Sequence, residues 1–105
     1  MSQPTSEAAV WAALEDVLDP ELGVDVVNLG LIYGIDVSGA VVSVEMTLTS
    51  PACPLSAQLE RDVKAAAGAL PGVELVRVRW SFDPPWSSAR ITEDGRDQLL
   101  ALGYA

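Results

Sequence analysis

The chain has 105 residues, half of them hydrophobic, with 15 acidic residues, 6 basic residues and no histidine. This length leaves room for one domain with one packed core, and the apolar fraction excludes wholesale disorder. The net charge of −9 argues against nucleic acid as a partner, and the lack of histidine excludes Ser-His-Asp triads and histidine-bound zinc.

The cysteine content and the N-terminal sequence indicate the compartment. The single cysteine, Cys53, cannot form an intramolecular disulfide. Residues 1–5 are predicted to be a flexible tail, and the N-terminal sequence MSQPTSEAAVW has neither the basic start nor the unbroken apolar run of a secretory signal. The apolar stretches are too short to span a bilayer. We therefore expect one domain, residues 1–105, in a cytoplasmic protein that binds neither membranes nor nucleic acid.

The first predicted element is a helix over residues 6–18. The apolar residues of its inner face recur at helical spacing: Val10, Leu14, Val17 and Leu18. Pro20 is expected to stop the helix, because the residue before a proline disfavours helical angles. The loop from Asp19 to Gly30 is long for so small a domain, and long ordered loops often carry function.

Two strands joined by a tight turn are expected next. Apolar residues alternate with other residues over residues 31–37, where Leu31 and Ile32 are assigned to opposite faces, and again over residues 40–49. Ser38 and Gly39 suit a two-residue hairpin turn, since glycine supplies a positive φ. The inner face of the second strand is predicted to consist of Ala40, Val42, Val44, Met46 and Leu48.

Cys53 lies where this strand pattern gives way to a helical one. The helical run comprises Leu55, Leu59, Val63, Ala66 and Leu70. Pro54 suits the first helical position, which makes Cys53 the expected N-cap. A thiolate there would face unpaired amides and the positive end of the helix dipole, which lower its pKa and favour metal or nucleophile chemistry. The alternative is a small hydrophobic residue buried beside two prolines.

A third strand and a last helix complete the predicted domain. The inner face of the strand is predicted to carry Val76, Val78, Trp80 and Phe82. Arg77 and Arg79 point the other way, where Glu45 is expected to meet them. The last helix begins after Thr92 as its N-cap. The order α-β-β-α-β-α predicts an α+β two-layer domain, with helices largely on one face of a three-stranded mixed sheet.

This order brings three loops to one edge of the sheet. A right-handed crossover makes the third strand parallel to the second, so both end where the first strand begins. Crevices beyond strand ends are common binding sites. The candidate neighbours of Cys53 at this edge are Asp19, Glu21, Asp25, Thr49, Ser50 and Trp86.

Most of these neighbours also have a structural interpretation. Asp19 before a proline is commonly a turn former, and Glu21 and Asp25 are more often solvated. Trp86 is either cover for the core or an anchor for a partner. A thiolate with a carboxylate, Cys53 with Asp19 or Glu21, can bind iron or zinc. One cysteine cannot hold an iron–sulfur cluster alone, so any cluster here is shared across a dimer or bound transiently.

Three blocks of the chain resemble one known family, the SufT- and PaaD-type metal–sulfur cluster biosynthesis proteins. The blocks are DPELGVDVVNLGLIYGI, MTLTSPACPL and DPPWSSARITEDGRDQL. The resemblance implies an α/β domain, usually homodimeric, that is an accessory in maturing iron–sulfur proteins and not a metabolic enzyme. Cys53 matches the family's reactive cysteine. Asn28 stands where many members have aspartate.

Three functions follow as hypotheses. The leading one is a cytoplasmic assembly factor in which Cys53 transiently binds iron, sulfide or a cluster, with scaffold or client proteins as partners. The first alternative is a non-catalytic adaptor that recruits partners through its acidic loop and Trp86, with a structural Cys53. An enzyme with Cys53 as nucleophile ranks last, because no histidine is present to act as its base.

Overall fold

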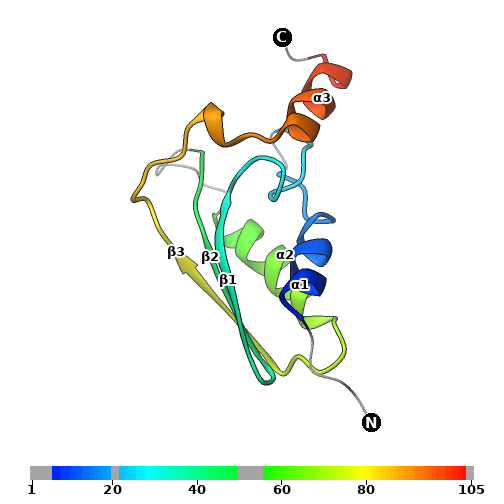
Figure 1. Cartoon of the computed structure of the whole chain (residues 1–105), viewed down its shortest axis with the longest axis vertical. Helices are drawn as coiled ribbons and strands as arrows, with labels where there is room; N and C mark the ends of the chain where they lie inside the picture. Colours follow the sequence, from blue (N-terminus) through cyan, green and yellow to red (C-terminus); the bar gives the residue numbers. More distant parts are fainter. Residues whose placement is uncertain (1–5, 20–21, 50–55, 104–105) are drawn as a thin grey trace.

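The computed structural model describes residues 6–19, 22–49 and 56–103. Within these ranges the elements follow the predicted order, with one short 3-10 turn before the last helix. Their bounds are α1 Glu7–Leu14, β1 Ile32–Ser38, β2 Val41–Met46, α2 Ser56–Gly68, β3 Leu75–Trp80, η1 Ser88–Arg90 and α3 Glu93–Ala101. The predicted α+β class with a three-stranded mixed sheet is confirmed (Figure 1).

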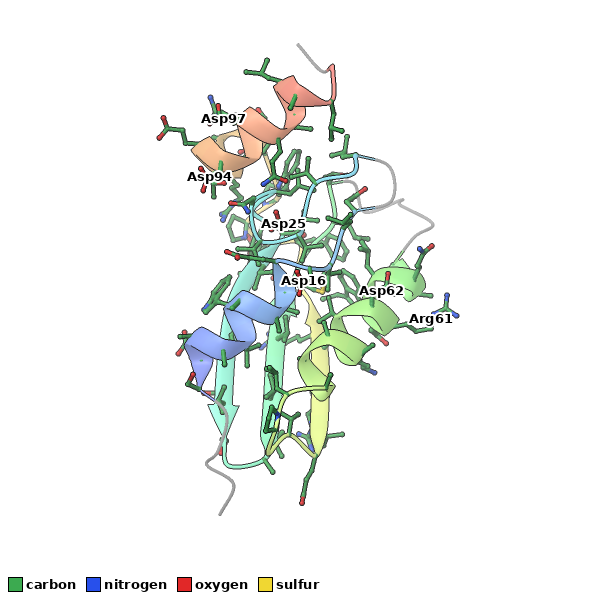
Figure 2. All side chains as sticks on the ribbon, turned by 90° about the vertical axis from the view of Figure 1, so that its right-hand side faces the viewer. Asp16, Asp25, Arg61, Asp62, Asp94 and Asp97 are labelled. Atoms are coloured by element: carbon green, nitrogen blue, oxygen red, sulfur yellow. The ribbon has the colours of Figure 1, made fainter. Side chains whose placement is uncertain are left out.

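The helices take two different positions relative to the sheet. α1 and α2 lie side by side on one face, as predicted, and the view in Figure 2 shows them in front of the strands. α3 lies beyond the end of the sheet at which β1 begins (Figure 1). No helix among the described residues is both long enough and apolar enough to cross a membrane.

The strand pairing agrees with the prediction. The sheet order is β1-β2-β3, with β1 antiparallel and β3 parallel to β2. Glu45 lies opposite Arg79, and the distance between Oε2 and Nη1 is 4.0 Å. The hairpin turn is one residue later than predicted, because Ser38 still pairs with Val41 and the turn falls on Gly39, with φ +59°, and the residue after it.

β1 departs from the predicted alternation because it carries a bulge between Ile32 and Gly34. The sequence places Ile32 on the face opposite Ile35 and Val37, yet Ile32 is buried and Ile35 and Val37 pack against the same core. Tyr33 is the extra residue at the bulge, and the pairing with β2 resumes at Gly34. A bulge of this kind redirects side chains, so the strict period of two does not hold across it.

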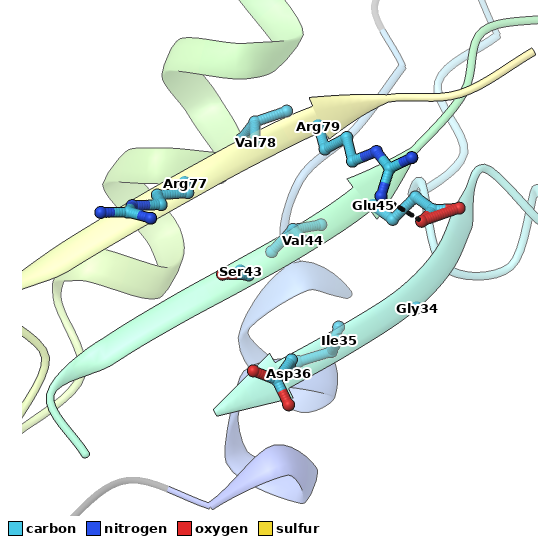
Figure 3. Close-up of a pocket in the computed structure, with 9 residues that line it drawn as sticks. All are labelled: Gly34, Ile35, Asp36, Ser43, Val44, Glu45, Arg77, Val78 and Arg79. Carbon is cyan, nitrogen blue, oxygen red and sulfur yellow. Dashed lines mark ion pairs between the residues drawn. The ribbon is translucent and has the colours of Figure 1, made fainter. Parts of the chain in front are cut away.

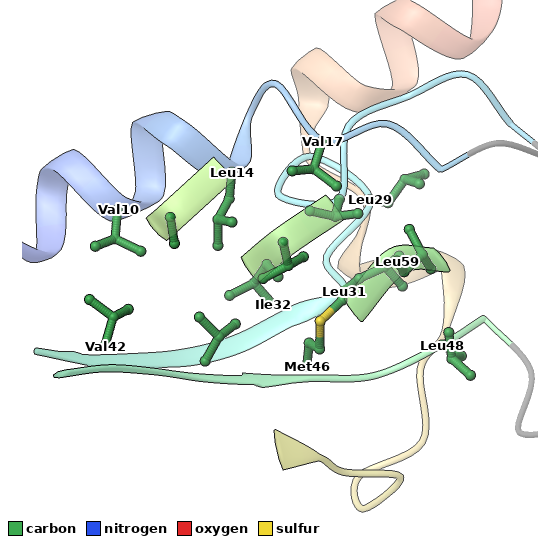
Figure 4. Packing of buried hydrophobic residues seen from close by; sticks show 14 of the residues in the cluster. Val10, Leu14, Val17, Leu29, Leu31, Ile32, Val42, Met46, Leu48 and Leu59 are labelled. Carbon is green, nitrogen blue, oxygen red and sulfur yellow. The ribbon is translucent and has the colours of Figure 1, made fainter. Parts of the chain in front are cut away.

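The core lies between the sheet and the two helices on its face (Figure 4). Its side chains, each at most 1% exposed, include Val10, Leu14, Leu29, Leu31, Val42, Val44, Met46, Leu59, Val63 and Ala67. Burying one such aliphatic side chain stabilises the fold by about 1.5–3 kcal/mol. The predicted inner faces of β2 and of α2 therefore form the main support of the domain.

α1 is shorter than predicted. Ser6 is its N-cap, but the helix ends at Leu14 instead of Leu18. Leu18 forms an isolated bridge with Asp25 and is 53% exposed. The assignment of Leu18 to the inner face is therefore wrong, because backbone pairing with the following loop replaces the helical turn there.

β2 and β3 also end earlier than predicted. β2 ends at Met46 instead of Thr49, and β3 ends at Trp80. Phe82, which was expected on the core face, is 42% exposed. That expectation is wrong because the chain has left the sheet by Phe82 and bends at Asp83.

Candidate functional site

The candidate site is the edge of the sheet where β1 begins and where β2 and β3 end. Cys53 and Ser50 lie outside the described residues, and so does Glu21. The described part of the edge consists of the loop before β1, the loop after β3, and α3 (Figure 1).

Asp19 closes a turn at the start of the first loop. Its side chain is among the buried polar groups, and its Oδ1 accepts a hydrogen bond from the N–H of Leu22 at 3.2 Å. The N–H of Asp19 donates to the carbonyl of Val24 at 2.9 Å, and the N–H of Gly23 donates to the carbonyl of Asp19 at 2.8 Å. The interpretation of Asp19 as a turn former is confirmed. Its predicted role as a metal ligand beside Cys53 stays a prediction.

Asp25 is buried, so the expectation that it is solvated is wrong. Its Oδ2 accepts from the N–H of Asn28 at 2.9 Å, and its Oδ1 accepts from the side-chain amide of Asn28 at 2.8 Å. The amide of Gln98 on α3 also approaches Oδ1, at 3.4 Å. A buried carboxylate requires such donors, because leaving it unpaired would be costly. Asp25 therefore ties the first loop to the last helix (Figure 2).

The side-chain amide of Asn28 both donates and accepts a hydrogen bond. The NH₂ group donates to Asp25, and Oδ1 accepts from the hydroxyl of Thr92 at 2.6 Å. The backbone carbonyl of Asn28 accepts from the N–H of Thr92 at 2.9 Å. Thr92 is also the N-cap of α3, as predicted, since its Oγ1 accepts from Gly95 at 3.0 Å. A neutral amide thus joins Asp25 to the start of α3, and no charge at position 28 is needed for that.

Trp86 joins the loop after β3 to the loop before β1. Its indole N–H donates to the carbonyl of Leu29 at 2.7 Å, and its ring packs against the core. The hydroxyl of Tyr33 donates to the carbonyl of Pro84 at 2.6 Å. These contacts confirm that the first and third loops meet. They also favour Trp86 as core cover, since its one donor is already used inside the chain.

Two glycines let the C-terminal segment approach the first loop closely. Gly30 has φ +74°, and a Cβ on it would lie 2.6 Å from the Cβ of Arg90. A Cβ on Gly95 would lie 2.5 Å from the carbonyl oxygen of Asn28. The guanidinium of Arg90 in turn lies over the ring of Tyr33, 4.4 Å from its centroid. Sequence reasoning missed Arg90 and Gly95, although a glycine inside a predicted helix is a signal of close packing.

Two threonines follow β2 before the second described range ends at residue 49. Thr49 is half-buried, and Thr47 is fully buried with no hydrogen-bond partner for its Oγ1 among the described residues. The described ranges contain no group of three or more Cys, His, Asp or Glu side chains able to hold a metal ion. A site formed by Cys53 with Asp19 or Glu21 involves residues outside these ranges and stays a prediction.

Comparisons with known proteins agree with this architecture. Residues 7–80 match the model of a family described as iron–sulfur cluster assembly protein. The chain is 42% identical over 95 residues, 90% of each chain, to the Fe-S protein maturation auxiliary factor YitW of Bacillus subtilis. It is 46% identical over 72 residues to an iron-sulfur cluster carrier protein of Deinococcus radiodurans, which covers 69% of this chain and 21% of the carrier.

A solved structure is similar over nearly the whole chain. It is the crystal structure of a domain of unknown function, DUF59, from Bacillus anthracis. The two chains share 39% identity with a TM-score of 0.85, over 94% of this chain and 92% of that one. The order of helices and strands described above is therefore shared with a fold seen by crystallography.

Proposed function

The chain belongs to the iron–sulfur cluster assembly protein family, and from this premise we propose that it is an accessory factor in the maturation of iron–sulfur proteins. The observation that carries the proposal is the family match over residues 7–80, together with similarity to an auxiliary factor over 90% of each chain. In this role the protein helps clients to acquire a cluster and has no small-molecule reaction of its own. Its partners are scaffold and client proteins of the cytoplasm.

Cys53 is the residue that we propose to handle the cargo, which is iron, sulfide or a cluster. Its support is the sequence: a lone cysteine at the predicted start of a helix, flanked by Thr49, Ser50 and Pro54. Asp19 and Glu21 are the carboxylates that we propose to assist it. Because one thiolate cannot retain a cluster, binding is transient or is completed by a second copy in a homodimer.

The described residues supply a framework for that chemistry. Trp86 fixes the loop after β3 to Leu29, and Asp25 fixes the loop before β1 to α3. These contacts use polar groups that would otherwise be unpaired in the interior. β2 leaves the sheet between the two fixed loops, so the segment that follows it starts from a defined position.

The experiment is complementation of a strain that lacks the gene. Parent protein is expected to restore the activity of a cellular iron–sulfur enzyme, and Cys53→Ser is expected to restore less than about a tenth of it. Thermal unfolding of both proteins controls for folding. A normally folded Cys53→Ser variant that restores full activity would contradict the chemical role of the thiol and leave the family assignment untouched.

The adaptor hypothesis is not favoured. Its anchor, Trp86, already donates its indole N–H to Leu29, and the relatives bear names of cluster carriers and maturation factors. Anaerobic reconstitution separates the two hypotheses. Iron and acid-labile sulfide bound to the parent, and absent from Cys53→Ser, support the carrier role, whereas no metal on either protein supports the adaptor.

A further inference from the structure

The face of the sheet opposite α1 and α2 forms a shallow hollow in the described structure (Figure 3). Its volume is about 590 Å³, and residues from all three strands line it. The polar side chains on this face are Asp36, Ser43, Glu45, Arg77 and Arg79. Gly34 leaves the floor open, because a Cβ there would meet nothing within 4 Å. The hollow lies on the face of the sheet and is separate from the strand ends near which Cys53 is predicted to act.

The charges in this hollow are arranged by strand. The chain has only six basic residues, and Arg77 and Arg79 both project from β3. The side chain of Arg79 is 82% exposed and pairs loosely with Glu45 at 4.0 Å. Arg77 lies opposite Ser43 and makes no ion pair with any described residue. A ligand that approaches from the β3 side therefore meets two cations before it meets Glu45.

β3 is an edge strand. It pairs with β2 on one side and with no strand of the described ranges on the other. An edge of this kind presents a row of backbone N–H and C=O groups on which an extended peptide can add as a further strand. Leu75, Arg77 and Arg79 share one face by the period of two, and Leu75 is 44% exposed.

We propose that the edge of β3 binds an extended segment of a partner protein, with acidic residues at alternate positions opposite Arg77 and Arg79 and an apolar residue opposite Leu75. Opposite charges directly across a strand pair stabilise the pairing, and like charges destabilise it. The proposal requires neither Cys53 nor a bound cluster. It therefore stands or fails independently of the proposed function.

A second copy of this chain fits the same edge less well. Two β3 strands paired about Val78 would bring the arginines of one copy beside those of the other. β1 of a second copy offers one acid, Asp36. Charge complementarity thus favours a foreign acidic segment over self-association.

The test uses a fluorescent peptide of about ten residues in which every second residue is valine and the positions between carry one leucine, to face Leu75, and otherwise glutamate; a matching peptide has lysine in place of glutamate. The glutamate peptide is expected to bind saturably, and more weakly as salt is added. Arg77→Glu with Arg79→Glu should weaken binding about tenfold or more. The control double variant Arg61→Glu with Arg96→Glu changes the net charge equally on exposed positions and should alter affinity by less than about twofold. Glu45→Gln should tighten binding about twofold, since it frees Arg79.

Amide chemical shifts locate the bound peptide. The expected result is that the shift changes concentrate on residues 75–80 and spare α1. The double variant Arg77→Lys with Arg79→Lys should retain most of the binding. Equal affinity for the lysine peptide, no saturable binding, or equal losses in the control variant would overturn the proposal. A dimer that closes over β3 and excludes the peptide, seen by sedimentation, would overturn it as well. Far-ultraviolet circular dichroism verifies that every variant is folded.

Discussion

Replacing Gly30 with alanine tests whether the close contact between the first loop and the C-terminal segment is a rigid feature of the fold. Gly30 has φ +74°, a region that costs a residue with a Cβ about 1–2 kcal/mol. The new Cβ would also lie 2.6 Å from the Cβ of Arg90 and closer still to its carbonyl oxygen. Backbone atoms cannot rotate away as a side chain can, so η1 would have to move.

A glycine series separates the two costs. Gly39 has φ +59° with nothing within 4 Å, so Gly39→Ala should cost about 1 kcal/mol for the backbone alone. Gly34 has neither a positive φ nor a described neighbour within 4 Å of a Cβ, so Gly34→Ala should stabilise the protein by roughly 0.5–1 kcal/mol. Gly30→Ala adds about 1–3 kcal/mol of forced contact to the backbone cost, for a loss of about 3 kcal/mol.

Urea unfolding followed by tryptophan fluorescence measures these differences, provided that the slope with denaturant stays constant across the series. In a domain of this size, about 3 kcal/mol corresponds to a fall in Tm of roughly 15 °C. If Gly30→Ala proved no less stable than Gly39→Ala, the backbone at Arg90 would be able to move away at little cost. The conclusion that the two loops and α3 form a rigid framework would then be refuted.

Three further substitutions test individual contacts by the same unfolding measurement. Asn28→Asp should cost about 1–3 kcal/mol at pH 7, because it replaces the amide that donates to Asp25 with a second carboxylate. Trp86→Phe should cost about 1–2 kcal/mol, because it leaves the carbonyl of Leu29 without its donor. Thr47→Val should stabilise the protein by about 1 kcal/mol, because it removes a buried hydroxyl that has no partner. An unchanged midpoint for Asn28→Asp or Trp86→Phe would contradict the corresponding contact, and an unchanged midpoint for Thr47→Val would contradict an unpaired hydroxyl at that position.

The layer arrangement could be predicted because it depends on patterns that extend over many residues. Alternation in β2 and the helical spacing of Leu59 and Val63 each repeat several times, so one exception does not change the assignment. The parallel pairing of β3 with β2 follows from the preferred hand of the crossover. The same patterns fail where a single residue determines the local backbone conformation. This happens at the bulge around Tyr33 and after α1, where Leu18 pairs with Asp25 instead of continuing the helix.

The site could be predicted only in part, for a related reason. The turn at Asp19 is local, and its residue types reveal it. The hydrogen bond between Gln98 and Asp25 joins residues 73 apart in the sequence, and neither residue type indicates the other. Sequence reasoning therefore assigned Asp25 to solvent by the usual behaviour of aspartate, whereas tertiary contacts bury it.

The C-terminal segment is part of the site, although the family match ends at residue 80. Four hydrogen bonds among the described residues attach that segment to the loop before β1, and their donors are Trp86, Gln98 and Thr92, which donates through both its hydroxyl and its N–H. Each satisfies an acceptor in the stretch 25–29, so removing the segment would leave those groups to water or unpaired. A loop with that many acceptors holds its conformation only while the donors are present. It follows that the geometry at the edge from which the Cys53 segment departs is set jointly by the family core and by residues that lie beyond it.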